Sequence, residues 1–314
     1  MDKTLILMGI VIVLALSMAT YFTYVERKIL AFMQLRKGPN VVGWFGLLQP
    51  IADAIKAITK EFLIPKNANK FLFVLAPIIV FSSSFLGFMV IPYDRDLVIA
   101  DMEYGLLFIL LVGLIGFIGM MIAGVYSYSN YAKISAIRII GQFIAFEIPL
   151  VTVFLVLALS AGSLNLSVIV NAQAGMWNIV THFPLFLVFL IVIMMETSRT
   201  PFDIPQAESE IVSGYQAEYS GLAFSYFMFF EYMSMLFLAF LTSTLFLGGW
   251  YGFGFLPGYA WLIMKSAVIS VLFIWLRATL PRLRFDQTLR LGFVYLAPLA
   301  FLWFLIVAGV KALW

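Results

Sequence analysis

The sequence predicts an all-α polytopic membrane protein with about eight transmembrane helices and a further amphipathic helix at the membrane interface. Of its 314 residues, 63% are hydrophobic and only 11% are charged, whereas a soluble domain carries about 25% charged residues. The apolar residues form uninterrupted runs of the length that crosses a bilayer as a helix. They do not alternate with polar residues as the strands of a membrane barrel do. We therefore expect one integral membrane domain over residues 1–314.

Apolar runs bounded by charges or by clusters of Pro, Gly and Asn are the candidate spans. They cover residues 4–24, 71–91, 104–125, 135–160, 183–197, 222–247, 260–280 and 291–312. The fifth run is short for a span. The first run begins near Met1 without a small-residue cleavage site, so we expect a retained helix and not a secretory signal.

The distribution of Lys and Arg predicts how the spans are oriented. Most basic residues lie in or beside the loops that follow the odd-numbered spans, namely Arg27, Lys28, Arg36, Lys37, Lys56, Lys60, Lys66, Lys70, Lys133, Arg138, Arg199, Arg277, Arg282, Arg284 and Arg290. Lys3, Arg95 and Lys311 fall on the other side, and Lys265 lies within a span. The odd-to-even loops are therefore expected to face the cytoplasm or matrix, with both termini on the outer side.

The first cytoplasmic loop, residues 25–70, contains an amphipathic segment. From Trp44 to Phe62 the apolar positions recur every three or four residues, while Asp53, Lys56 and Lys60 occupy the other face. This pattern indicates a helix that lies in the plane of the interface and is too charged to span. Pro50 suits its first turn, and Gln49 is its expected cap. Such a helix can be a plain surface anchor, or it can shape a site beside the spans.

Two acids are predicted at bilayer depth. Glu147 lies near the middle of the fourth span and Glu231 lies well inside the sixth. A carboxyl group in that position costs a few kcal/mol on insertion scales, so both are candidate functional groups. Arg138 lies on the opposite face of the same helix from Glu147, so the partner of Glu147 must come from another helix, or the acid must be neutral. A protonated Glu that bonds a neighbouring helix is the structural alternative.

A second loop, residues 196–221, is acidic although it lies on the side predicted to be basic. Its acids, accompanied only by Arg199, are Glu196, Asp203, Glu208, Glu210 and Glu218. Pro201 and Pro205 predict a tight, non-helical turn around Asp203. Clustered acids repel one another and raise some of their pKa values, so the loop can hold or relay protons. Alternatively, the acids complement the dipole of a short helix.

The chain is expected to hold no redox centre and no metal. It has no cysteine and one histidine, His182, which we expect to be interfacial and without a functional role. Thiolate sites and Fe–S ligand sets are thereby excluded, and haem or zinc ligation is disfavoured. Any electron chemistry must therefore take place on a partner.

Three blocks of the sequence carry a family resemblance. The first holds ERKILA at 26–31, RKGPNVVG at 36–43 and GLLQP at 46–50, followed by charged residues up to Glu61. The second runs from ETSRTPFD at 196–203 to EYSG at 218–221, and a weaker third spans 130–147. In these blocks the chain resembles the heel subunit of respiratory complex I. This is the H subunit of the bacterial proton-translocating NADH–quinone oxidoreductase and subunit 1 of mitochondrial NADH dehydrogenase.

The resemblance implies a subunit that joins the hydrophilic redox arm to the membrane arm. It implies that the quinone-tunnel and loop-contact residues are Glu26, Arg27, Arg36, Lys37, Asp53 and Phe202. It implies that the proton-coupling residues are Glu147, Glu196, Asp203, Glu208, Glu210 and Glu231. Replacing Glu147 by Gln should then reduce proton pumping more than assembly.

The resemblance also implies what this chain works with. The substrate is a quinone, either ubiquinone or menaquinone, while FMN and Fe–S clusters reside on partner subunits. The partners are the quinone-site subunits of the hydrophilic arm, the small membrane subunits on the antiporter side and the lipid bilayer, with no nucleic acid. The expected location is the bacterial cytoplasmic membrane, or the mitochondrial inner membrane for an organellar chain.

The chain departs from the family pattern at several positions. Ser198 stands where Asn is usual, Gln206 where an acid is common and Gln216 where His is frequent, and Lys133 is atypical. The neutral Gln206 leaves open how many groups in the acidic loop exchange protons.

Three other functions compete with the quinone-reducing one. The nearest is the equivalent subunit of an energy-converting hydrogenase or a related complex with another electron donor, which the intact block at 38–40 and the acidic loop disfavour. A self-contained secondary transporter, with Glu147 and Glu231 as its proton site, should contain an inverted repeat, and none is detectable. A purely structural anchor for the redox arm gives no reason for acids at bilayer depth.

Overall fold

The fold is all-helical, as predicted. The computed structural model describes residues 2–252, 254 and 256–313, and no strand occurs within those ranges. In this part of the chain, 7 helices are long and apolar enough to cross a membrane. They are α1 (Asp2–Met33), α3 (Lys70–Val90), α4 (Gly105–Tyr126), α5 (Asn130–Ala161), α10 (Gly221–Phe246), α11 (Gly258–Thr279) and the continuous stretch of α12 (Phe285–Arg290), a π-helical turn η3 (Leu291–Leu296) and α13 (Ala297–Leu313).

The remaining expected span, 183–197, is the short helix α8 (Phe183–Glu196), which has 14 residues. At 1.5 Å per residue it rises about 21 Å, less than the roughly 30 Å of the hydrocarbon core. Two small helices precede it, α6 (Leu166–Ala172) and α7 (Asn178–Thr181). Because α8 is short, its last residue, Glu196, ends inside the bundle with one carboxyl oxygen, Oε2, buried.

One expected boundary near the N-terminus is wrong. Helix α1 continues past residue 24 to Met33, so Glu26 and Arg27 lie on the helix and not in the loop. The amphipathic helix α2 covers Gln49–Thr59 and has Pro50 in its first turn, as expected, although its apolar pattern extends from Trp44 to Phe62. The residues before it form a short 3-10 turn, η1 (Trp44–Gly46). Phe45 has a positive φ of 53°, and a Cβ atom at Gly46 would lie 2.3 Å from the Pro39 carbonyl oxygen. This close approach breaks the helical pattern that begins at Trp44.

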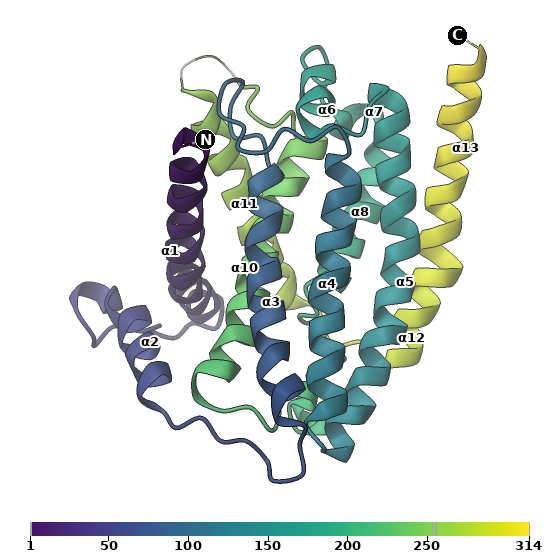
Figure 1. The fold of residues 1–314 in the computed structure, drawn as a ribbon. Coiled ribbons are helices and arrows are strands. Elements are labelled where there is room, and N and C mark those ends of the chain that lie inside the picture. The colour runs from purple at the N-terminus through teal and green to yellow at the C-terminus, as the bar shows by residue number, and fades with distance from the viewer. Residues whose placement is uncertain (1, 253, 255, 314) are drawn as a thin grey trace.

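Helix α10 lies in the interior of the bundle (Figure 1), where it packs against α3, α11 and α1. Helix α5 packs against α4, α8 and α13. Helix α1 forms one edge of the molecule and α13 the other, and α2 lies beside the lower end of α1. Both labelled termini lie toward the upper end of the view.

The acidic segment between α8 and α10 folds back against α5 and contains α9 (Glu208–Ile211) and a 3-10 turn, η2 (Gly214–Gln216). Ser135 on α5 donates a hydrogen bond of 2.5 Å to the carbonyl oxygen of Pro205. Gln142 donates to the carbonyl oxygens of Met195 and Phe202, at 2.6 and 3.2 Å. These bonds fix the acidic segment against α5.

Candidate functional site

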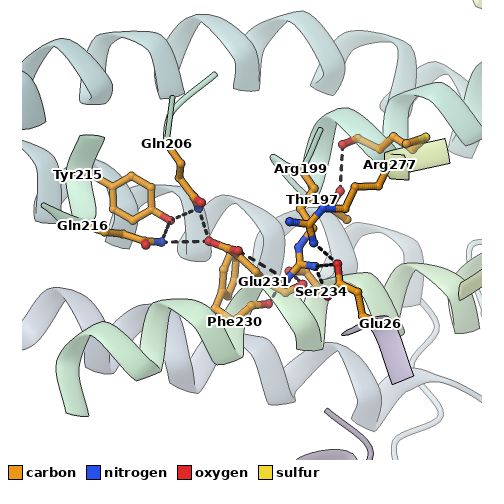
Figure 2. A network of polar contacts seen from close by, with 11 residues as sticks. Glu26, Thr197, Arg199, Gln206, Tyr215, Gln216, Phe230, Glu231, Ser234 and Arg277 are labelled. Atoms are coloured by element: carbon orange, nitrogen blue, oxygen red, sulfur yellow. Dashed lines mark hydrogen bonds and ion pairs between the residues drawn. The ribbon is translucent and has the colours of Figure 1, made fainter. Parts of the chain in front are cut away.

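Glu26 joins three distant parts of the chain at the lower end of α1 (Figure 2). Its carboxylate is 1% exposed and accepts two hydrogen bonds of 2.9 Å from Arg199 Nη1, one on each oxygen. Arg277, on α11, also donates to Glu26 Oε1. Because a buried charge is tolerated only when it is paired, these contacts explain how an acid near the C-terminal end of α1 can lie inside the protein.

The same arginine reaches a second buried acid, Glu231, on α10. Arg199 Nη2 lies 3.6 Å from Glu231 Oε2, and its guanidinium lies 4.0 Å from the centre of the Tyr232 ring. The other carboxyl oxygen, Oε1, accepts amide hydrogens from Gln206 and, at 3.0 Å, from Gln216. Arg199 therefore bridges Glu26 and Glu231, and Gln206 and Gln216 hold the far side of Glu231 (Figure 2).

Tyr215, in η2, completes this network outside the spans. Its hydroxyl accepts from Gln206 at 3.2 Å and from Gln216 at 2.9 Å, and its side chain is fully buried. Burial, and then the nearby charge of Glu231, raise the pKa of Tyr215 above its usual value. The hydroxyl is therefore protonated at neutral pH.

Two adjoining cavities lie beside the network. The first, about 710 Å³, is polar and is lined by residues that include Arg199, Asp203, Glu231 and Arg277. The second, about 350 Å³, is mostly apolar and lies between α1, α2 and α10, where Arg27 and Asp53 are among its lining residues. Both cavities are lined by Phe224, Met228 and Tyr232. The two cavities therefore adjoin at these shared side chains.

Further ion pairs fix the loops around the cavities. Arg282 donates to the carbonyl and carboxylate oxygens of Asp203, with 3.0 Å between Nη2 and Oδ2. Arg138 on α5 pairs with the exposed Glu210 at 2.6 Å. Arg27 pairs with Asp53 on α2 at 2.8 Å, and both side chains are about half-exposed. The Arg27 pair joins α1 to α2, and the other two hold the acidic loop.

A separate pair of acids lies on α5 and at the end of α8. Glu147 on α5 is half-buried, and Glu196 ends α8 close enough that their charges interact. Within the described part of the chain neither acid forms an ion pair, and Glu196 Oε2 is buried without a hydrogen-bond partner. The neighbours of Glu147 on the same helix, Ile144 and Ile148, are each 46% exposed, so Glu147 lies near the outer surface of the bundle.

The structure brings some of the expected residues together and leaves others apart. Glu26 and Glu231 share Arg199, and Arg27 and Asp53 line the apolar cavity. Phe202 is buried and presents its backbone carbonyl to Gln142. The exposed residues Arg36 and Lys37 line neither cavity. The side chain of Glu208 lies outside the described residues.

Sequence reasoning did not select Arg199, Arg277 or Arg282 as site residues, although they hold Glu26, Glu231 and Asp203. It used these arginines only to orient the spans. A signal was available for Arg277, since it falls inside the predicted span 260–280, where a buried charge of either sign is a functional hypothesis. For Arg199 and Arg282 the signal was their place next to the acidic loop. Among the described residues there is no group of three or more side chains suited to hold a metal ion.

The fold and these contacts define the class of the protein: an all-helical, multi-pass membrane protein with a buried network of acids and arginines beside two adjoining cavities. The family model described as NADH dehydrogenase matches residues 5–308. Similar proteins are named as the H subunit of NADH-quinone oxidoreductase. That of Paramagnetospirillum magneticum is 44% identical over 312 residues, which cover 98% of this chain and 92% of the relative.

Two further relatives agree. The H subunit of Rhodospirillum rubrum is 44% identical over 296 residues, and that of Rickettsia felis is 45% identical over 298 residues. Each alignment covers 92% of this chain and 88% of the relative. The chain therefore belongs to the NADH dehydrogenase family that contains the H subunit of NADH-quinone oxidoreductase, or complex I. It is a subunit of that enzyme and a multi-pass membrane protein.

Proposed function

We propose that this chain forms part of the quinone tunnel of complex I and carries the first groups of its proton-coupling path. The observation that carries the proposal is the pair of cavities that share Phe224, Met228 and Tyr232. The apolar cavity begins between α1, α2 and α10, and the polar cavity ends at the buried network of Glu26, Arg199 and Glu231. Together they supply an apolar route with charged groups at one end.

This arrangement suits the chemistry of a quinone, either ubiquinone or menaquinone. A quinone has a long isoprenoid tail and a polar head, and such ligands need an apolar slot with a few placed polar groups. Helix α2 and the facing part of α10 supply the slot, with Arg27 and Asp53 at its rim. Phe202 supports the acidic loop through its bond to Gln142, beside the polar cavity.

Reduction of the quinone consumes two electrons and two protons and creates charge in a poorly solvated site, where electrostatic effects are large. The electrons come from the FMN and Fe–S clusters of partner subunits. Asp203, Glu208, Glu210 and Glu231 respond to that charge by changing protonation or position. Arg199 carries the response inward, because it contacts both Glu26 and Glu231.

Glu196 and Glu147 continue the proton-coupling path across the bundle. Their charges interact, and they lie on neighbouring helices, α8 and α5. Glu147 lies near the outer surface of the bundle, so the next proton-accepting group belongs to a small membrane subunit on the antiporter side. In this scheme the chain passes the effect of quinone reduction toward the proton-translocating subunits.

The proposed orientation places residues 25–70 and 196–221 on the cytoplasmic or matrix side, with both termini outside. Arg36 and Lys37 are exposed there and contact the quinone-site subunits of the hydrophilic arm. The chain thus joins the redox arm to the membrane arm. The membrane is the bacterial cytoplasmic membrane, or the mitochondrial inner membrane for an organellar chain. The names of the relatives favour this role over that of an energy-converting hydrogenase.

The tunnel is tested by narrowing the apolar cavity from α2. Ala57 lines this cavity, whereas Ile55 on the same helix is 57% exposed and does not line it. In the purified complex, Ala57→Trp should raise KM for a long-tailed quinone and leave the rate with a short-tailed quinone near normal. Ile55→Trp is the matched control and should change neither. Equal effects of Ala57→Trp on both quinones, or none on either, would contradict the tunnel.

A further inference from the structure

A third cavity lies between the polar face of α2 and the start of α10, beside the apolar cavity of the proposed tunnel. Its volume is about 440 Å³, and its walls come from residues 53–60 and 219–225. We call it the basic cleft. The residues that give it polar walls are Asp53, Lys56, Lys60, Ser220 and Ser225.

The two lysines of the basic cleft have no anionic partner among the described residues. Lys56 and Lys60 are exposed, and neither forms an ion pair there. They lie four positions apart at the end of α2, so their side chains share one face and repel each other. Asp53, the acid in the lining, is already held by Arg27 at 2.8 Å and by Gln49 at 3.0 Å. The cleft therefore presents two cations that an anion would bring together.

Backbone contacts hold the two walls of the basic cleft in place. Gly221 has a positive φ of 56°, and a Cβ atom there would lie 2.9 Å from the carbonyl oxygen of Lys60. Ser220 Oγ donates to the carbonyl oxygen of Glu61 at 3.0 Å and accepts from the amide of Leu63 at 3.1 Å. The start of α10 is thus fixed against the end of α2. A ligand of the cleft meets a preorganised site, which lowers the entropic cost of binding it.

The basic cleft continues into the apolar cavity between α1, α2 and α10. The two share Asp53, Ala57, Phe224 and Ser225 as lining residues. Ile58 also lines the apolar cavity and is 63% exposed. A ligand that uses both surfaces must carry an anionic group next to apolar chains. An anionic phospholipid has this combination, and basic amphipathic helices at a membrane interface attract such lipids.

We propose that the basic cleft binds the phosphate group of an anionic phospholipid between Lys56 and Lys60, with an acyl chain against Ile58. In the proposed orientation the cleft lies on the cytoplasmic or matrix side, at the level of the lipid headgroups. The bound lipid would border the route by which quinone enters. That consequence rests on the proposed tunnel, whereas the binding of the lipid does not.

The site is tested by removing its two charges. The double variant Lys56→Gln/Lys60→Gln does so and keeps the pair of Arg27 and Asp53. Lys66→Gln is the matched control, because Lys66 is an exposed lysine of the same loop that does not line the cleft.

The intact complex is placed in nanodiscs of phosphatidylcholine alone, of equimolar phosphatidylcholine and phosphatidylglycerol, or of phosphatidylcholine with inorganic phosphate in the buffer. Cryo-electron microscopy shows what occupies the cleft. Titration with spin-labelled phosphatidylglycerol measures the affinity.

We expect density for a headgroup with its chains in the cleft of the wild type and of Lys66→Gln in phosphatidylglycerol, and none in the double variant. Each lysine near an anionic headgroup strengthens binding about fivefold, so the double variant should bind spin-labelled phosphatidylglycerol about 25-fold more weakly at this site. Phosphatidylcholine alone should leave the wild-type cleft without an ordered headgroup.

Four results would overturn the proposal. In the wild type these are a cleft that is empty in phosphatidylglycerol, one filled by an acidic side chain of another subunit, and one occupied only by inorganic phosphate. They decide the matter even if the double variant fails to assemble. The fourth is a double variant that binds phosphatidylglycerol as tightly as the wild type.

Quinone kinetics in the same nanodiscs separate this proposal from the proposed function. If the lipid is bound while Ala57→Trp affects long-tailed and short-tailed quinones equally, the tunnel fails and the lipid site stands. If Ala57→Trp impairs only the long-tailed quinone while the wild-type cleft is empty in phosphatidylglycerol, the tunnel stands and the lipid site fails.

Discussion

Glu26 shows how strongly a single buried charge depends on its partners. Its carboxylate faces two guanidinium groups, those of Arg199 and Arg277. Glu26→Gln keeps the shape of the side chain but removes the anion that lies between the buried Arg199 and the partly exposed Arg277. Arg199 is then left with Glu231, at 3.6 Å, as its ion-pair partner among the described residues. Removing one partner of a buried pair costs about 3–5 kcal/mol, so the melting temperature of the subunit within the complex should fall by several degrees.

Asp53 provides the control for Glu26, because its pair with Arg27 is largely hydrated, with side-chain exposures of 51% for Arg27 and 41% for Asp53. Exposed pairs contribute about 0–1 kcal/mol, so Asp53→Asn should leave the melting temperature nearly unchanged. If both variants melt at the same temperature, the central role given to Glu26 is wrong.

His182 confers a pH dependence at the junction of α7 and α8. Its Nδ1 accepts a hydrogen bond of 3.2 Å from Trp303 Nε1 on α13. Burial lowers the pKa of His182 below the usual value of about 6.5. The unfolded chain therefore binds a proton more readily, and stability falls as the pH drops from about 6.5 toward the folded pKa.

A variant isolates this contribution. His182→Gln keeps an acceptor for Trp303 but does not titrate. Between about pH 7.5 and about pH 5.5, the wild-type melting temperature should fall more than that of His182→Gln, because only the wild type must charge a buried imidazole. Parallel melting curves across this range would show that His182 does not titrate with unfolding.

Individual site residues were predictable to different degrees. The costs of burying a carboxyl group identified Glu147 and Glu231, and the family resemblance identified Glu26, but no sequence pattern indicated that Arg199 bridges Glu26 and Glu231. Glu26 and Arg199 are 173 positions apart, and only tertiary packing brings them together. Arg277, by contrast, could have been predicted. The cost of burying a charged side chain applies to cations as well as to carboxylates, and Arg277 lies inside the predicted span 260–280.

Lys265 stabilises the connection between α10 and α11. Its ammonium group is buried and donates to the carbonyl oxygens of Leu247, Gly249 and Tyr251 at 2.5–3.0 Å, and it lies 4.4 Å from the centre of the Trp177 ring. These carbonyls follow the end of α10, where the helix dipole favours a cation. Lys265, on α11, thus holds the residues that directly follow α10 against α11.

Removing this ammonium group should loosen the connection. Lys265→Met leaves three carbonyl oxygens without their donor, at about 1–3 kcal/mol for each buried group left unsatisfied. The segment that follows α10 should then become sensitive to protease at a lower temperature than in the wild type. The corresponding temperature for Lys265→Arg should lie between those of Lys265→Met and the wild type. Lys311→Met removes an exposed lysine that bonds the carbonyl oxygen of Leu159 and should have no effect. A Lys265→Met complex as resistant as the wild type would contradict this role.

The ends of the long, uninterrupted apolar helices were predictable, whereas the end of a helix that carries charged residues was not. Hydropathy gave α3, α4 and α10 within one residue at each end, because lipid requires continuous helices. Helix α2 begins at Gln49, as Pro50 in its first turn predicts, although its apolar pattern begins at Trp44. The chain before Gln49 turns against Pro39, a contact that hydrophobic periodicity does not record. Helix α1 extends further because the charges at its end are neutralised from other segments.

At the scale of the whole molecule, the groups of the proposed path lie one after another across the bundle. The apolar cavity lies by α1 and α2 at one edge, and the charge network occupies the centre around α10. The pair of Glu196 and Glu147 lies on α8 and α5, on the way to the other edge (Figure 1). The order of these groups was implied by the family resemblance, whereas the cavities could be found only from the packed helices.

The most direct measurement is the number of protons translocated per electron by the intact complex carrying Glu147→Gln, reconstituted in proteoliposomes. Glu103→Gln is the control, because Glu103 is exposed just before α4 begins. We predict that Glu147→Gln keeps assembly and inhibitor-sensitive quinone reduction and lowers proton translocation, while Glu103→Gln changes neither. Normal quinone reduction together with normal translocation in Glu147→Gln would contradict the coupling path.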